Sequence, residues 1–166
     1  MKTLFKWISN FFYFVLLVAM VVVGIGYAIG LRPYITMSGS MEPAIHTGSV
    51  CVIDTKATYD EVQKDDMIAF AASSGMLVTH RAINITEEGI ETKGDANEIS
   101  DGITTTRETF RGITLFSIPY LGYVFAKLQT PYGMAIIGIL ILAVVAFNII
   151  DAIEEKNMKN LVIKEE

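Results

Sequence analysis

A serine-containing turn near residue 40 has the residue types that nucleophilic catalysis needs. Gly39 separates Ser38 from Ser40 and allows backbone angles that other residues avoid, and Pro43 restricts the chain shortly afterwards. Such a turn can expose a hydroxyl and a backbone N–H together, as a serine nucleophile with an oxyanion hole requires. Taken alone, the same residue types are more typical of an ordinary Ser/Gly loop, so the interpretation depends on finding a base and an acid.

Two histidines and two aspartates are available to complete such a site. His80 lies in an alternating, strand-like run, and His46 follows the candidate nucleophile by six positions. A neutral imidazole can accept the proton of a serine hydroxyl. A polar loop further along contains Asp95 and Asp101, either of which could orient an imidazole. The residue types alone do not choose between the histidines or between the aspartates.

The composition argues against metal, disulfide and nucleic-acid chemistry. The chain has 166 residues with two histidines and one cysteine, too few for a multi-histidine site or a Cys/His cluster with zinc spacing. We therefore expect no cofactor and no metal. Cys51 lies in an apolar run and is expected to be a small buried side chain rather than a reactive thiol. The net charge of −5 disfavours a nucleic-acid partner.

Two long apolar segments enclose the residues that could form this site. Hydrophobic residues make up 52% of the chain, and the mean hydropathy is +0.45. Neither residues 7–31 nor residues 128–150 include a charged side chain. Each stretch exceeds the roughly 20 residues that cross the hydrocarbon core of a bilayer. We predict transmembrane helices over residues 10–31 and 131–150.

The flanks of these segments predict the orientation of the chain. The first apolar run is longer than the ~7–15-residue core of a cleaved signal peptide, and no clear small-x-small cleavage site ends it, so we expect an uncleaved anchor. Lysines occur in both tails, residues 1–9 and 151–166. The positive-inside rule then places both tails in the cytoplasm and residues 32–130 outside it. The expected location is the cell membrane, with two spans.

The segment between the spans is expected to form a mainly β domain. Short β-branched or apolar runs alternate with turn signals, and helical periodicity is weak. The fold class is therefore a β domain flanked by two transmembrane α-helices. The expected strands are Ser49–Ile53, Met67–Ala71, Met76–Ile85, Ile90–Lys93 and Gly112–Ile118.

The candidate nucleophile is expected to lie near the outer membrane surface. Ser40 follows the first span by about nine residues, which reach at most ~30 Å when fully extended. Four apolar residues near it either contact the membrane interface or pack in the domain core, and the sequence leaves both alternatives open. They are Ile35, Met37, Met41 and Ile45.

Three boxes, in this order, resemble those of the type I signal peptidases. Ser38–Pro43 resembles the nucleophile box, in the Ser-Gly-Ser-Met-Glu-Pro form of the endoplasmic-reticulum-type branch. His80–Ile83 resembles the second box, in which a histidine replaces the lysine of the common bacterial branch. That histidine marks the branch shared by the eukaryotic enzyme, archaea and some Gram-positive bacteria. Lys93–Asn97, followed by Asp101, resembles the third box, and the resemblance covers most of residues 10–150.

The resemblance implies a role for each matching residue. Ser40 matches the nucleophile and His80 the general base, which leaves His46 as a loop residue. The Ser38 hydroxyl matches a group that assists the oxyanion hole beside the backbone N–H of Ser40. The resemblance favours Asp101 as the third catalytic residue, with Asp95 as the alternative. The implied fold is the signal-peptidase-like β fold, consistent with the strand pattern.

The implied function is that of signal peptidase I, a serine endopeptidase. It would cut N-terminal signal peptides from secretory preproteins at the outer face of the membrane. The implied partners are preproteins with small residues before the cut, the lipid bilayer and the Sec translocation machinery. Two alternatives stay open: a catalytically inactive, membrane-anchored β domain that serves as a translocation scaffold, and a membrane-bound regulatory protease that cleaves itself. A scaffold would not need the hydroxyl of Ser40.

Overall fold

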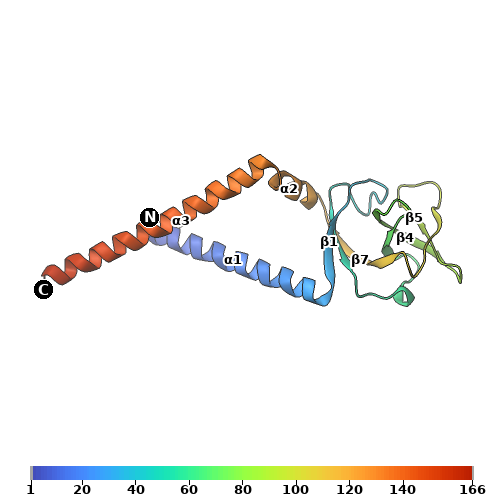
Figure 1. Ribbon diagram of the computed structural model, residues 1–166, viewed down its shortest axis with the longest axis horizontal. Helices are drawn as coiled ribbons and strands as arrows, with labels where there is room; N and C mark the ends of the chain where they lie inside the picture. Colours follow the sequence, from blue (N-terminus) through green and yellow to red (C-terminus); the bar gives the residue numbers. More distant parts are fainter. Residues whose placement is uncertain (1, 166) are drawn as a thin grey trace. The chain divides into compact units, whose positions relative to one another are not determined.

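The chain divides after Gly122 into two compact units. The computed structural model describes residues 2–165, so Met1 and Glu166, the outermost residues of the two predicted tails, lie outside the described residues. The first unit contains the first long helix and a β-sheet, and the second consists mainly of helix (Figure 1). The helices are α1 (Lys2–Ile29), the short 3-10 helix η1 (Tyr59–Glu61), α2 (Leu121–Leu128) and α3 (Pro131–Glu165).

A single seven-stranded sheet makes up the β domain. Its order is β1-β2-β7-β3-β4-β5-β6, and every neighbouring pair is antiparallel. Together with the two long apolar helices, this sheet confirms the predicted fold class. The strands are β1 (Leu31–Ile35), β2 (Val50–Asp54), β3 (Met67–Ala71), β4 (Leu77–Ile85), β5 (Ile90–Lys93), β6 (Gly102–Thr105) and β7 (Phe110–Ile118).

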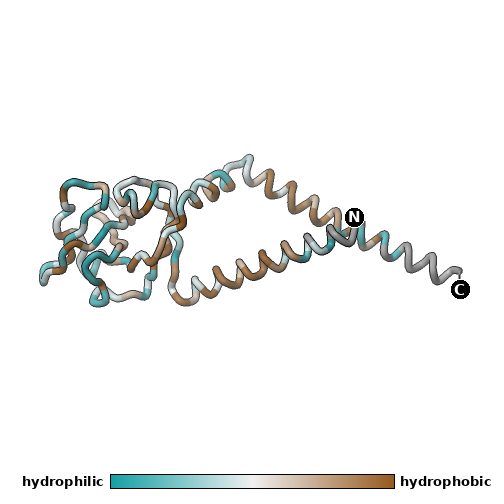
Figure 2. The backbone as a smooth tube through the Cα atoms, turned by 180° about the vertical axis from the view of Figure 1, so that it is seen from behind, coloured by the Kyte–Doolittle hydropathy of each residue, from teal (hydrophilic) through white to brown (hydrophobic). Residues whose placement is uncertain are grey.

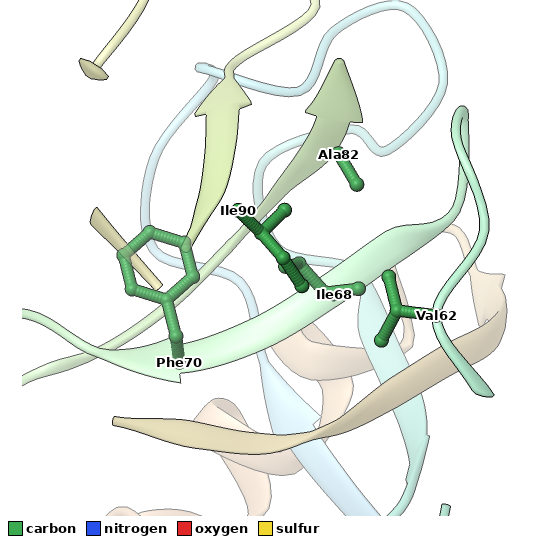
Figure 3. Close-up of a cluster of buried hydrophobic side chains, with 5 residues drawn as sticks. All are labelled: Val62, Ile68, Phe70, Ala82 and Ile90. Atoms are coloured by element: carbon green, nitrogen blue, oxygen red, sulfur yellow. The ribbon is translucent and has the colours of Figure 1, made fainter. Parts of the chain in front are cut away.

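The main core cluster is formed by strands from the middle of the sheet and one loop. Successive side chains of a strand point to opposite faces, so alternate residues enter the core. In β5, for example, Ile90 and Thr92 are buried, whereas Glu91 and Lys93 are only half-buried. The cluster, drawn in Figure 3, consists of Val62, Ile68, Phe70, Ala82 and Ile90.

A second, smaller core cluster lies under the candidate nucleophile loop. It consists of Met41, Ile45 and Cys51, with Met67 packed against it. Cys51 is 2% exposed, as expected for a small buried side chain. Of the four apolar residues near Ser40, two pack in the domain core. Met41 and Ile45 belong to the core, whereas Ile35 and Met37 expose 39% and 86% of their surface.

Both edge strands of the sheet escaped the sequence prediction. β1 contains Arg32 and Pro33, and proline lacks the N–H that a central strand donates, so the pattern does not read as a strand. It pairs only with β2, where Pro33 lies opposite Val52. β6 begins at Gly102, a residue type that favours turns, and pairs with β5. The two missed strands have few buried residues, so burial imposes little alternation on their sequences.

Two helices are long and apolar enough to cross a membrane. The qualifying segments are Ser9–Ile29 of α1 and Pro131–Glu154 of α3. Among the described residues, 0% and 6% of their most apolar windows are buried, so neither is the core helix of a soluble domain. Figure 2 shows the apolar residues running along α1 and along the first part of α3. With length and composition in agreement, these helices indicate a membrane-anchored protein.

The end of α1 is tied to the sheet by cationic side chains. Arg32 donates from Nη1 to the carbonyl of Tyr27 at 2.8 Å and lies over the Tyr27 ring. Lys56 donates from Nζ to the carbonyl of Ala28 at 3.1 Å. The last carbonyls of a helix lack partners within the helix and carry partial negative charge, so both contacts stabilise the end of α1. β1 consequently begins directly where the helix ends.

Candidate active site

The loop that carries Ser40 is held in place by its neighbours. Met41 is buried, and its carbonyl accepts the backbone N–H of Ile45 at 2.8 Å. Glu42 accepts the backbone N–H and the hydroxyl of Thr47, both at 3.1 Å. These two hydrogen bonds, the backbone one first, lower the pKa of Glu42, so the carboxylate stays ionised and keeps both donors. The loop therefore has a defined shape in the segment that follows Ser40.

Ser40, His80 and Asp101 form a continuous chain of polar contacts. His80 is a buried residue of β4, and its Nε2 lies 3.0 Å from Ser40 Oγ. Its Nδ1 lies 2.5 Å from Asp101 Oδ2, in the loop between β5 and β6. A carboxylate at Nδ1 favours the tautomer whose Nε2 lone pair faces the hydroxyl. This arrangement can remove the serine proton and stabilise the imidazolium that results.

Asp95, the alternative acid, is engaged elsewhere. Arg81 donates from Nε to Asp95 Oδ1 at 2.8 Å and from Nη2 to Asp95 Oδ2 at 2.6 Å. Arg81 also donates from Nη1 to the carbonyl of Asp65 at 2.7 Å. The hydrogen bonds that Arg81 donates to Asp95 raise the pKa of Arg81. Both oxygens of Asp95 are thus held by a guanidinium, and the structure brings Asp101 to the imidazole instead.

The loop after β5 also contacts the nucleophile loop through its backbone. The N–H of Ala96 donates to the carbonyl of Ser40 at 2.9 Å. A Cβ added at Gly94 would lie 2.6 Å from that same carbonyl oxygen, too close for any other residue to be accommodated without movement. Gly94 therefore permits the close approach of the two loops, and Asp95, the partner of Arg81, directly follows it in sequence.

Ser38 and His46 are the other two residues that the sequence singled out. Ser38 lies next to Ser40, whereas His46 contacts Tyr120. The Ser38 hydroxyl is 3.2 Å from Ser40 Oγ, so it is close enough to act on an oxyanion formed there. The ring of His46 stacks on the ring of Tyr120, with centroids 5.6 Å apart. The imidazole that contacts Ser40 belongs to His80.

An apolar groove of about 400 Å³ adjoins Ser40. One wall is the segment from Tyr34 to Ser38, which continues β1 toward the nucleophile, and the other is the start of β4 from Leu77 to Thr79. Cys51 lies among the lining residues, and burial raises the pKa of its thiol, which keeps it a neutral part of the lining. Two extended segments on either side of a groove suit an extended peptide.

Sequence reasoning missed the residues that support this site. Arg81 and Thr92 were not singled out, although each contacts one of the two candidate aspartates. The alternation of β5 contained a signal for Thr92, because its position places a hydroxyl on the buried face. Among the described residues, no group of three or more His, Cys, Asp or Glu side chains is placed to hold a metal ion.

A serine hydroxyl, an imidazole and a carboxylate connected in this order are typical of serine hydrolases. No protein-family model matches the chain. The chain is similar to Signal peptidase I W of Bacillus subtilis, with 38% identity over 88 residues, which cover 50% of this chain and 46% of that protein. The chain thus spans about half the length of the curated relative it matches. This similarity confirms the predicted resemblance to the type I signal peptidases.

Proposed function

We propose that this protein is a signal peptidase I of the endoplasmic-reticulum type. It acts as a serine endopeptidase that removes N-terminal signal peptides from secretory preproteins. The observation that carries the proposal is the 3.0 Å approach of His80 Nε2 to Ser40 Oγ, continued by Asp101 at Nδ1. The similarity to Signal peptidase I W supports the substrate class.

The first half of the reaction forms an ester on Ser40. Ser40 Oγ attacks the carbonyl carbon of the last signal-peptide residue while His80 Nε2 accepts the hydroxyl proton. The negative charge on the former carbonyl oxygen is stabilised by the backbone N–H of Ser40 and the hydroxyl of Ser38. The imidazolium then gives its proton to the leaving amine, and the C–N bond breaks. Asp101 stabilises the imidazolium throughout.

The second half releases the signal peptide. His80 takes a proton from water, the hydroxide attacks the acyl carbon, and the proton returns to Ser40 Oγ as the ester breaks. The apolar groove beside Ser40 binds the residues before the cut in an extended conformation. The groove lies so close to the nucleophile that small side chains fit best next to the scissile bond.

The membrane anchors bring the site to its substrate. With both termini in the cytoplasm and two spans, the β domain lies at the outer face of the membrane, where the cleavage site of a translocating preprotein emerges. Two apolar helices and the exposed Ile35 and Met37 near the groove support this location. The Sec translocation machinery is the expected source of preproteins.

The direct test is Ser40→Ala in the full chain, assayed for preprotein cleavage in vesicles. Removing the nucleophile leaves no atom to form the ester, so we expect cleavage to fall by about 10⁶-fold, to background. His46→Ala is the control and should cleave normally, because the imidazole that contacts Ser40 belongs to His80. Retained cleavage by Ser40→Ala would exclude the proposed mechanism. If neither the parent chain nor the Ser40→Ala variant cleaves preproteins, the scaffold alternative is favoured.

A further inference from the structure

Thr92 contacts the Asp101 carboxylate from inside the sheet. It is a β5 residue with 0% exposure, and its Oγ1 donates to Asp101 Oδ2 at 3.0 Å. That oxygen is the same one that lies 2.5 Å from His80 Nδ1. The main chains are also joined, because the N–H of Asp101 donates to the carbonyl of Thr92 at 2.9 Å. One carboxylate oxygen therefore faces two donors from two neighbouring strands.

We propose that Thr92 is a positioning residue, whose hydroxyl holds Asp101 Oδ2 against His80 Nδ1. The inference rests on the proposed function, since it concerns the residue that orients the general base. Asp101 lies in a loop, and its side chain keeps 22% of its accessible surface, so water competes for its oxygens. A donor built into a strand removes that freedom before substrate binds, because a buried β5 side chain has one orientation.

The hydroxyl at position 92 has a purpose beyond packing. A valine has nearly the shape of threonine and fits a β-strand as well, without a polar group to bury. Thr105, in the adjacent strand β6, is also 0% exposed, yet its Oγ1 has no hydrogen-bond partner among the described residues. The sheet thus contains two fully buried threonines in neighbouring strands, of which Thr92 alone bonds to Asp101. Thr105 supplies a matched control.

Three variants of the full chain in detergent micelles separate positioning from packing. Thr92→Val keeps the shape and removes the hydroxyl, whereas Thr92→Ser keeps the hydroxyl and removes a methyl group. Thr105→Val makes the same change at the matched site. If Thr92→Val does not fold, Thr92→Cys replaces it, because the thiol is a much weaker donor than the serine hydroxyl and has a similar side-chain length.

The first measurement is the Nδ1–H proton resonance of His80 in protein labelled with ¹⁵N-histidine. The chain has two histidines, so His46→Gln assigns the spectrum and the His46 signal serves as an internal reference. We expect Thr92→Val to shift or broaden the His80 signal, and Thr92→Ser and Thr105→Val to leave it in place. An unchanged His80 signal in Thr92→Val overturns the proposal.

The second measurement is the steady-state cleavage of a preprotein. We expect kcat to fall about tenfold in Thr92→Val with KM unchanged, as for the loss of one hydrogen bond to a charged group. Thr92→Ser should stay within about twofold of the parent chain. A loss in Thr92→Ser as large as that in Thr92→Val would show a packing role and contradict the proposal. The resonance needs no turnover, so it tests Thr92 even if the parent chain proves inactive, an outcome that overturns only the proposed function.

Discussion

Two neighbouring residues of β4 each take an aspartate from the same loop, and they use it differently. His80 is buried and meets Asp101 through one ring nitrogen, while its other nitrogen faces Ser40. Arg81 points to the other face of the strand and holds Asp95 through two parallel hydrogen bonds. Asp101 contacts one ring nitrogen of His80 and leaves the other facing Ser40, whereas both oxygens of Asp95 accept hydrogen bonds from Arg81.

One loop therefore supplies one aspartate to an imidazole and another to a guanidinium. Asp95 lies between Gly94 and Ala96, and the N–H of Ala96 donates to the carbonyl of Ser40. The pair of Arg81 and Asp95 joins β4 to the loop after β5. Substituting each aspartate should separate the chemistry from the support.

The largest effect is expected at Asp101. In Asp101→Asn the amide cannot stabilise an imidazolium as a carboxylate does and favours the wrong tautomer of His80, so we expect kcat to fall by about 10³–10⁴-fold. The variant should fold normally. Preprotein cleavage and a thermal melt in detergent measure the two properties, and activity within tenfold of the parent chain would contradict the assignment of Asp101.

A smaller and different effect is expected at Asp95. Asp95→Asn removes the charge that Arg81 requires in a partly buried pair, and we expect it to lower the free energy of unfolding by about 2 kcal/mol. Activity measured well below the melting temperature should fall much less than in Asp101→Asn. If Asp95→Asn abolished cleavage while leaving the melting temperature unchanged, the roles of the two aspartates would have to be exchanged.

The smallest effect is expected at Glu42, on the other side of Ser40. Thr47 lowers the pKa of Glu42 in the folded chain. The ionised carboxylate therefore stabilises the folded state at pH values above its ordinary pKa of 4.5. That contribution is lost as the pH falls through the lower folded value. Melting curves should show Glu42→Gln below the parent chain at pH 7 and equal to it at strongly acidic pH. If Glu42→Gln still melts below the parent chain at strongly acidic pH, the lost stability comes from packing instead.

Much of the fold could be predicted because it follows from local patterns. Uncharged stretches longer than a membrane span predict α1 and α3, and alternating runs predict the inner strands. β1 escaped because Arg32 and Pro33 do not read as a strand, and only pairing with β2 makes them one. The groove beside Ser40 escaped as well, since its lining comes from segments about 40 residues apart in the sequence, near Tyr34–Ser38 and Leu77–Thr79.

The sequence by itself determined that the chain is anchored by apolar segments, that its middle is a β domain, and that Ser40 lies in a turn suited to a nucleophile. These properties depend on residue type and spacing along one stretch of chain. The residue types alone left His46 and Asp95 open, and the resemblance favoured His80 and Asp101. Only the tertiary structure shows His80 beside Ser40, Asp101 beside His80, and the Thr92 hydroxyl donating to Asp101. The physical reason is that strand alternation and sheet register set which side chains of distant segments face each other, and hydrogen bonds form only over about 3 Å.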